Sequence, residues 1–312
     1  GPCKTKVIYD LETKRHCSNI SPYLIDSAVV SVKRSRRPIC GQHLMTYGNM
    51  PYSKSLVLDD RECKDLLAQS PEASKFIKKF AGGHEFLHSV ERFCLWIEDS
   101  ELNEALSIPG IQKRIEETKK QREASSDLGG RKLAARSHQF RDRNQADKYS
   151  IVLARTSSEN RAYLPPGFAD ASWVFSSEAF VLYDALPFYL AFLTSRLHLM
   201  WIATVCGKMK TDIRYSNTLG WNTFPVPTLT EKNREDLTRC AENILLAREA
   251  HFPKTIADLY APEKMPENLR QAHEENDEVL ERIYIGRRFR NDTERLEKLF
   301  EMYTKMTKNN AA

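Results

Sequence analysis

The chain has 312 residues, which is enough for about two domains with a sizeable buried core. Hydrophobic residues make up 41% and charged residues 29% of the sequence, a composition too apolar for a disordered protein. The net charge of +5 permits an anionic partner without requiring one. The seven cysteines form no C-x-x-C pair, so a disulfide framework and a four-thiolate zinc site are both disfavoured, and we expect a reducing, cytoplasmic setting.

The first part of the sequence predicts short strands that alternate with helices. The β-branched segment 28–33 predicts a strand that runs into a basic stretch at 33–37. Residues 56–58 predict a second strand, and an aspartate pair after it suits the start of a helix that ends near residue 69. A further helix is expected at 71–80, because proline in the first helical turn needs no N–H. The leading Gly-Pro resembles the scar of a protease cleavage site, which would make the chain an excised piece of a longer protein.

Residues 109–148 form the most basic stretch of the chain. Its beginning is expected to be helical, because isoleucines recur there at helical spacing. Acidic residues are interleaved with the basic ones. The stretch is therefore either a solvated helix of mixed charge or a surface that faces phosphates, and both interpretations stay open.

The second half predicts strands at 150–154, 161–164 and 179–182, and then a long apolar segment at 186–206. That segment is long enough to span a membrane, but an arginine and a histidine lie at its middle, where a charge in lipid costs roughly 2.5–3.5 kcal/mol. We therefore expect a buried helix there. Further helices are predicted at 231–250, 255–260, 266–284 and 292–307.

These elements together predict an α+β fold. A mixed strand–helix domain is expected at 18–228, followed by an all-helical bundle at 229–312. The boundary falls after Pro225-Val-Pro227, where the strand signals end and helical periodicity begins.

The segment His84-Glu-Phe-Leu-His88 matches the H-E-x-x-H signature of zinc metallopeptidases. In that chemistry the two histidines hold the metal from one face of a helix, and the glutamate activates a water. The glycines before this segment and the strand-like residues 92–97 after it favour a β-hairpin instead, in which positions i and i+4 lie roughly 13 Å apart. We therefore expect no metal site here and keep a zinc peptidase acting through His84, Glu85 and His88 as the alternative enzyme hypothesis.

No other segment predicts a catalytic centre. Asn19-Ile-Ser-Pro-Tyr23 only faintly resembles the Asn/Asp-Pro-Pro-Tyr loop of amino-methyltransferases, since it lacks the second proline. The sequence contains neither a G-x-x-x-x-G-K-[ST] phosphate loop nor a G-x-S-x-G nucleophile motif. We expect this chain by itself to be no enzyme and to hold no cofactor.

The most informative stretch is 207–216. If it is extended, Lys210, Asp212 and Arg214 point the same way at intervals of roughly 6.6 Å, close to two base-pair steps. Lysine can donate to guanine O6 and N7, and aspartate can accept from cytosine N4, so one Lys/Asp pair could contact both bases of a G·C pair. The alternative is a surface strand whose alternating charges neutralise one another.

This stretch resembles the C-terminal part of the MmeI-like (type IIL) restriction–modification enzymes and related adenine-specific DNA methyltransferases. Gly207-Lys-Met-Lys-Thr-Asp-Ile-Arg-Tyr-Ser216 is similar to the family's run G-R-L-K-S-D-Y-R-Y-S. Trp221-Asn-Thr-Phe-Pro-Val-Pro227 is similar to Y-N-N-F-P-W-P, and Met265-Pro-Glu-Asn-Leu-Arg270 also fits the family's tail. The sequence departs from the family at Tyr52-Ser-Lys54 and at Val226.

The resemblance implies a target recognition domain and a helical tail, with double-stranded DNA as a partner and no membrane. It also implies an upstream methyltransferase domain that binds S-adenosylmethionine and methylates adenine N6. The family's base-reading pair falls on Lys210 and Asp212, with Arg214 as a further candidate. We expect phosphate contacts to supply most of the affinity, from Lys33, Arg34, Arg36, Arg37, Lys119, Arg122, Arg131 and Lys132. A third hypothesis is a protein-interaction module in which the apolar faces of the tail helices dock a partner.

Overall fold

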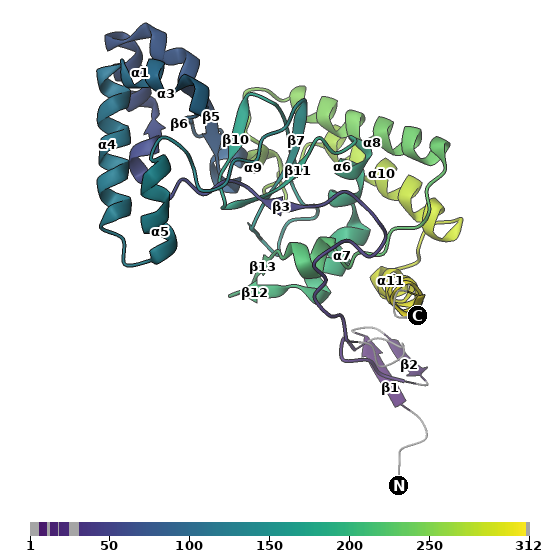
Figure 1. Cartoon of the computed structure of the whole chain (residues 1–312). Helices are drawn as coiled ribbons and strands as arrows, with labels where there is room; N and C mark the ends of the chain where they lie inside the picture. Colours follow the sequence, from purple (N-terminus) through teal and green to yellow (C-terminus); the bar gives the residue numbers. More distant parts are fainter. Residues whose placement is uncertain (1–5, 11–12, 18, 25–30, 310–312) are drawn as a thin grey trace.

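The computed structural model describes residues 6–10, 13–17, 19–24 and 31–309, which form two lobes and a projecting hairpin (Figure 1). The hairpin consists of β1 (Lys6–Asp10) and β2 (Thr13–Cys17), which pair antiparallel. It extends away from both lobes in Figure 1. The strand predicted at 28–33 lies mostly outside the described residues, and its described part, 31–33, forms no regular element.

The first lobe is built on a four-stranded sheet of order β10-β5-β6-β4. Its strands are β4 (Val57–Asp59), β5 (Ile77–Ala81), β6 (Arg92–Leu95) and β10 (Trp173–Phe175). β10 pairs parallel with β5, and the other pairs are antiparallel. The helices of this lobe are α1 (Asp60–Gln69), α2 (Gly83–Leu87), α3 (Leu102–Leu106), α4 (Pro109–Glu123) and α5 (Leu128–Lys132). Four 3-10 turns complete it: η1 (Lys54–Leu56), η2 (Pro71–Phe76), η3 (Asp99–Glu101) and η4 (Leu133–Arg136).

Local sequence signals account for some elements of this lobe, and strand pairing accounts for the others. The predicted start of α1 is confirmed, because Asp59 and Glu62 form a capping box with hydrogen bonds of 2.8 and 3.1 Å. The helix predicted at 71–80 is wrong in its second half, where Ile77–Ala81 forms β5. β5 lies between β10 and β6, and the pairing on both edges outweighs the local helical preference.

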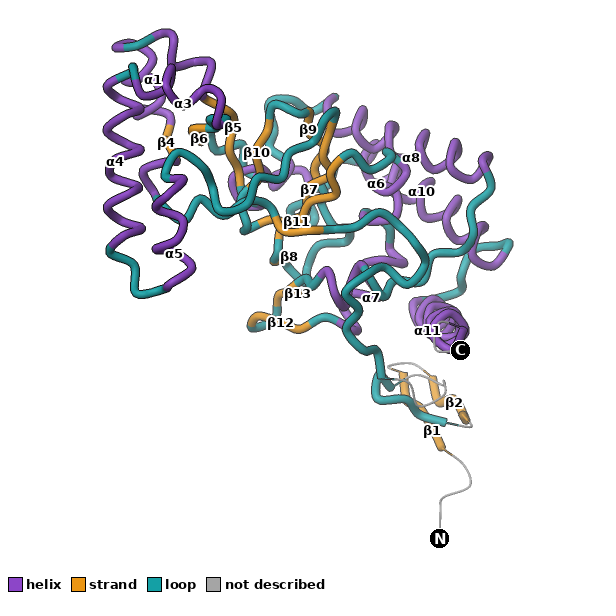
Figure 2. Tube along the Cα trace, in the orientation of Figure 1, coloured by secondary structure: helices purple, strands orange, loops and turns teal. Residues whose placement is uncertain are grey.

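The second lobe contains an antiparallel sheet of order β3-β11-β7-β9, which lies between the helices of the two lobes in Figure 2. Its strands are β3 (Thr46–Tyr47), β7 (Tyr149–Ala154), β9 (Gly167–Asp170) and β11 (Ala179–Tyr183). β7 and β11 confirm two of the predicted strands. The strand predicted at 161–164 is wrong: this segment is irregular, and Tyr163 is buried with its hydroxyl donating to Asp277 at 3.0 Å. Its apolar character therefore serves a contact with the helical tail and not a strand pairing.

The apolar segment at 186–206 is buried, as predicted, but it forms two helices. These are α6 (Phe188–Leu193) and α7 (Arg196–Val205). The break falls at Ser195, whose Oγ accepts from the His198 N–H at 3.1 Å and caps α7. Arg196, which lies at the start of α7, forms a two-bond ion pair with Asp292 of the tail at 2.9 and 2.7 Å. None of the helices in the described ranges is long and apolar enough to cross a membrane.

The four predicted tail helices are confirmed. They are α8 (Glu231–Glu249), α9 (Ile256–Leu259), α10 (Glu267–Ile285) and α11 (Asp292–Asn309). α8 packs against α6 and α10, and α11 packs against α7. Tail residues such as Leu237, Leu280 and Phe300 belong to the same hydrophobic core as Trp201. The fold is therefore α+β, as predicted, and the apolar faces named for the interaction-module hypothesis are covered within the chain.

Candidate nucleic-acid interface

A small three-stranded sheet of order β12-β13-β8 carries the residues predicted to contact bases. Its strands are β8 (Thr156–Ser157), β12 (Gly207–Met209) and β13 (Asp212–Arg214). β12 and β13 form a hairpin in which Met209 faces Asp212, so Lys210 and Thr211 make a two-residue turn. The prediction of one extended segment through Lys210 is therefore wrong, because the chain reverses there with a φ of 57° at Lys210.

The hairpin nevertheless keeps the three predicted side chains close together. Asp212 and Arg214 are two residues apart on β13 and share a face of that strand. Lys210 is exposed at the tip, Arg214 is exposed, and Asp212 is half-buried. Among the described residues, no side chain forms a hydrogen bond or ion pair with Lys210, Asp212 or Arg214. Their charged groups are thus available to a ligand.

Buried contacts hold the hairpin from below. Ile213 and Tyr215 point into the core, where they are 4% and 5% exposed. The Tyr215 hydroxyl and His198 Nε2 share a hydrogen bond of 3.0 Å, and the Tyr215 N–H donates to the Arg155 carbonyl at 2.9 Å. Burial lowers the pKa of His198 to about 3, so this histidine is neutral at physiological pH. Buried packing and hydrogen bonds therefore anchor the base of the hairpin to the core.

The predicted phosphate-contacting residues Lys33, Arg34, Arg36 and Arg37 are all exposed on one loop. The backbone of this loop is tied to the turn η5 (Asn217–Trp221), where the Ser35 N–H donates to the Thr218 carbonyl at 2.9 Å. Burial raises the pKa of the Cys206 thiol to about 11, and the nearby charge of Arg34 opposes that shift. Because Cys206 directly precedes β12, Arg34 lies near the root of the hairpin.

The basic residues of α4 and α5 divide into exposed and buried ones. Lys119, Arg131 and Lys132 are exposed. Arg122 is fully buried, and its guanidinium donates to the carbonyls of Leu133, Arg136, Pro51 and Gln139 at 2.7–3.0 Å. This placement corrects the prediction for Arg122, since a side chain enclosed by backbone carbonyls cannot reach a phosphate.

Two charged residues near the hairpin were not predicted. Arg155 lies beside Glu178, with 3.5 Å between Nη1 and Oε2, and its guanidinium lies over the Tyr47 ring. Glu178 also borders a cleft of about 750 Å³ whose other walls include Phe80 and Arg92 of the first lobe. A sequence signal for the pair existed: Arg155 directly follows a predicted strand and Glu178 directly precedes another, and antiparallel pairing brings such positions together.

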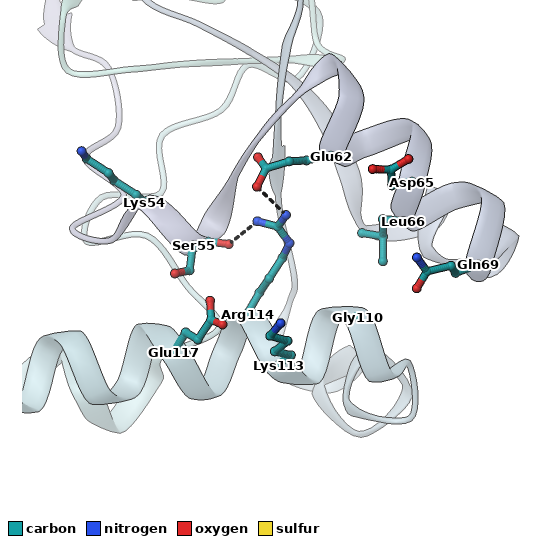
Figure 3. A pocket seen from close by; sticks show the side chains of 10 residues that line it. All are labelled: Lys54, Ser55, Glu62, Asp65, Leu66, Gln69, Gly110, Lys113, Arg114 and Glu117. Atoms are coloured by element: carbon teal, nitrogen blue, oxygen red, sulfur yellow. Dashed lines mark hydrogen bonds and ion pairs between the residues drawn. The ribbon is translucent and has the colours of Figure 1, made fainter.

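A second cleft, of about 500 Å³, lies between α1 and α4 (Figure 3). Figure 3 shows Arg114 at its centre, directed toward Ser55 and Glu62. The guanidinium donates to the Ser55 carbonyl at 3.2 Å and to the Glu62 carboxylate at 3.0 Å. Arg114 thus braces α4 against the sheet, and this cleft is explained by contacts within the first lobe.

The H-E-x-x-H segment forms a helix, so the predicted hairpin is wrong. His84 and His88 lie one turn apart around α2, with stacked rings whose centroids are 4.3 Å apart. Glu85 accepts from the Gly82 N–H at 3.0 Å and forms an ion pair with Arg92, so it caps its own helix. The described part of the chain contains no group of three or more His, Cys, Asp or Glu residues that could hold a metal ion.

Comparison with known proteins gives concordant results. The family model of the MmeI target recognition domain matches residues 26–228, and that of the MmeI C-terminal domain matches residues 229–310. DNA methyltransferase A of Bacillus subtilis (strain 168) is 40% identical over 311 residues, which cover 98% of this chain and 35% of the relative. A solved structure of the type IIL restriction–modification enzyme MmeI in complex with DNA matches 98% of this chain and 42% of that chain, with a TM-score of 0.88 and 31% identity.

The chain therefore spans little more than a third of the length of the curated relative. The resemblance predicted from the Gly207–Ser216 motif is confirmed, and it extends over nearly the whole sequence. The chain belongs to the MmeI family, of which it carries the target recognition domain and the C-terminal domain.

Proposed function

We propose that this chain is the DNA-sequence-reading part of a larger type IIL restriction–modification enzyme with DNA methyltransferase activity. The match to MmeI, whose structure was solved in complex with DNA, supports this proposal. So does the name of the curated relative, a DNA methyltransferase. The observation that carries it is the β12–β13 hairpin, which presents an acidic and two basic side chains that form no hydrogen bond or ion pair with the other described residues.

The hairpin has suitable dimensions and chemistry for direct base contacts. The major groove of B-DNA admits a two-stranded β-ribbon, and each base pair presents a distinct pattern of donors and acceptors there. Lys210 donates to guanine O6 and N7, and Asp212 accepts from cytosine N4. Arg214 shares a face of β13 with Asp212 and contacts a neighbouring base or phosphate. Each good contact contributes roughly 1–3 kcal/mol of discrimination between bases.

Affinity comes mainly from phosphate contacts. The loop with Lys33, Arg34, Arg36 and Arg37 lies near the root of the hairpin, so these cations reach the backbone flanking the contacted bases. Lys119, Arg131 and Lys132 are further candidates on the first lobe.

The chemical step belongs to an upstream domain outside this chain. That domain binds S-adenosylmethionine and methylates N6 of an adenine in the cytoplasm, after flipping the base out of the duplex. This chain has no catalytic role in the proposal; it selects the sequence at which methylation occurs.

The test is selection from a library of randomised DNA duplexes by the 312-residue chain at low salt, followed by sequencing. The wild-type chain should enrich one short sequence, whereas Lys210→Ala and Asp212→Ala should each lose preference at one and the same base pair. Lys232→Ala is the matched control, because Lys232 is exposed on α8 in the tail. A wild-type chain that enriches no sequence would contradict the proposal, as would unchanged preferences in both hairpin variants.

A further inference from the structure

The loop that follows β8 lies against the base-reading hairpin. β8 pairs antiparallel with β13, with Ser157 facing Ile213 and Thr156 facing Arg214. In the same register, Ser158, which follows β8, lies level with Asp212. The chain then turns back, because the Arg161 N–H donates to the Ser158 carbonyl at 3.3 Å. The fold thus brings Arg161 beside Asp212.

Two charge contacts of opposite polarity connect this loop with the hairpin. Glu159 forms an ion pair with Lys208 of β12, with 3.5 Å between Oε2 and Nζ. Arg161 is half-buried near Asp212. Burial lowers the pKa of the Arg161 guanidinium, and the negative charge of Asp212 opposes that shift. The loop therefore meets each hairpin strand with the complementary charge.

Arg161 is unusual among the arginines at this surface. Removing a guanidinium from water is costly unless a counter-charge or hydrogen bonds compensate for it. In the ranges that the structure describes, no acceptor forms a hydrogen bond with its side chain, and Asp212 is the charged group that acts on it. Its donors have thus no evident structural task, unlike those of Arg122 in the first lobe.

We propose that Arg161 is a positioning residue for base recognition, which orients the Asp212 carboxylate toward the base edge. This inference rests on the proposed function. A carboxylate approaching the major groove is repelled by the DNA phosphates, and an adjacent positive charge offsets that repulsion. An arginine is suited to this task, because its planar fork fixes the orientation of a carboxylate that a lysine would hold only as a point charge.

The test is a double-mutant cycle on discrimination. Each protein is tested with two duplexes. The first is the duplex that the wild-type chain enriches, and the second differs from it only at the base pair that the Asp212→Ala variant no longer distinguishes. Arg161→Gln should lower discrimination at that base pair by roughly tenfold, equivalent to about 1.4 kcal/mol. Arg161→Gln combined with Asp212→Ala should discriminate no worse than Asp212→Ala alone, because Arg161 acts through Asp212. Arg161→Lys should recover part of the loss.

Controls separate this role from a general one. Arg239→Gln removes an exposed arginine paired with Asp236 at 2.6 Å on α8, and it should leave discrimination unchanged. Should Arg161→Gln fail to fold, as judged by circular dichroism, Arg161→Met keeps the apolar part of the side chain and takes its place in the cycle.

The outcomes are distinguishable. The inference is overturned if Arg161→Gln weakens binding to all duplexes equally, which indicates a phosphate contact, or if its effect adds fully to that of Asp212→Ala. If Asp212→Ala itself leaves discrimination unchanged, the base-reading assignment of the proposed function fails instead.

Discussion

Tyr215 and His198 share a buried hydrogen bond of 3.0 Å directly beneath the strand that carries Asp212 and Arg214. Tyr215 follows β13, whereas His198 lies on α7, and both are enclosed by apolar side chains. His198 Nδ1 has no partner in the described structure, so Nε2 makes the ring's one hydrogen bond there. The pair thus ties the hairpin to the central helix of the second lobe.

Replacing the hydroxyl should therefore destabilise the protein. Tyr215→Phe keeps the ring but leaves a buried imidazole with both nitrogens unpaired, which costs about 1–3 kcal/mol. Urea denaturation of the variant and the wild type measures the difference in the free energy of unfolding. Tyr9→Phe is the matched control, because Tyr9 is 73% exposed and the same change should have little effect there. Equal stability of wild type and Tyr215→Phe would contradict the role of this bond.

His198 should also make stability depend on pH. Burial lowers its pKa to about 3, from 6.5 for an exposed histidine. As the pH falls below 6.5, the unfolded chain binds a proton on this ring and the folded chain does not, so the free energy of unfolding falls between pH 6.5 and 3. The loss at pH 5 is about 2 kcal/mol.

The variant His198→Gln removes this contribution while keeping a polar side chain opposite Tyr215. Its free energy of unfolding should decline less steeply than that of the wild type between pH 7 and pH 5, as measured by denaturant titrations at each pH. His273, a second buried histidine with a strongly lowered pKa, remains in both proteins, so some decline persists. Parallel pH profiles would refute the assignment to His198.

Arg122 should behave as a core residue. Its Nη1 and Nη2 groups donate to four backbone carbonyls, one at Pro51 and three within residues 133–139, and Arg122→Lys leaves several of these carbonyls without a donor. We expect a loss of about 3 kcal/mol in the free energy of unfolding. Thermal denaturation checks this, with Lys119→Ala on the exposed face of α4 as the neutral control. A stable Arg122→Lys variant with weakened DNA binding would reverse our correction.

Arg36 should behave in the opposite way. It is exposed on the basic loop, so Arg36→Ala should leave the unfolding temperature unchanged. If Arg36 contacts a phosphate, the slope of log Kd against log salt concentration should become shallower by about one, to a similar extent for all duplexes. Fluorescence anisotropy at several salt concentrations measures that slope. The same slope as in the wild type would remove Arg36 from the phosphate-contacting set.

The contrast between these arginines shows what local sequence can predict. The tail helices were predictable because their caps are local: Thr230 with Asn233 and Thr255 with Asp258 form capping boxes. Burial of Arg122 depends on carbonyls from loops up to 71 residues away in sequence, and no local pattern encodes that distance. Which basic residues remain candidates for phosphate contacts therefore depends on their neighbours in the folded structure.

The β12–β13 hairpin was missed for a different reason. Two-residue hairpin turns are usually recognised in a sequence by glycine or asparagine, which tolerate positive φ. Here a lysine, Lys210, occupies the turn position with positive φ, so the sequence predicted one uninterrupted extended segment. The identity of the three candidate residues could be predicted from charge and family resemblance, but their arrangement around a turn could not.

This turn leads to the last prediction, which separates stability from recognition. A lysine at a φ of 57° is conformationally strained, and such strain costs of order 1–3 kcal/mol. Lys210→Gly relieves the strain, although glycine loses more conformational entropy on folding, so the free energy of unfolding should be unchanged or higher by up to about 1 kcal/mol. The same variant removes the ammonium group from the tip and should lower discrimination roughly 5- to 150-fold at the base pair that Lys210 is proposed to contact.

Ser89→Gly is the matched control for Lys210→Gly. Ser89 has a φ of 53° in an exposed turn of the first lobe, so glycine relieves comparable strain there without changing the hairpin. It should leave discrimination unchanged, whereas Lys210→Ala should lose discrimination without gaining stability. Unfolding curves and duplex competition assays on the three variants check both quantities. If Lys210→Gly distinguishes bases as well as the wild type does, the Lys210 side chain does not contribute to base recognition, and recognition does not explain the strained lysine at this turn.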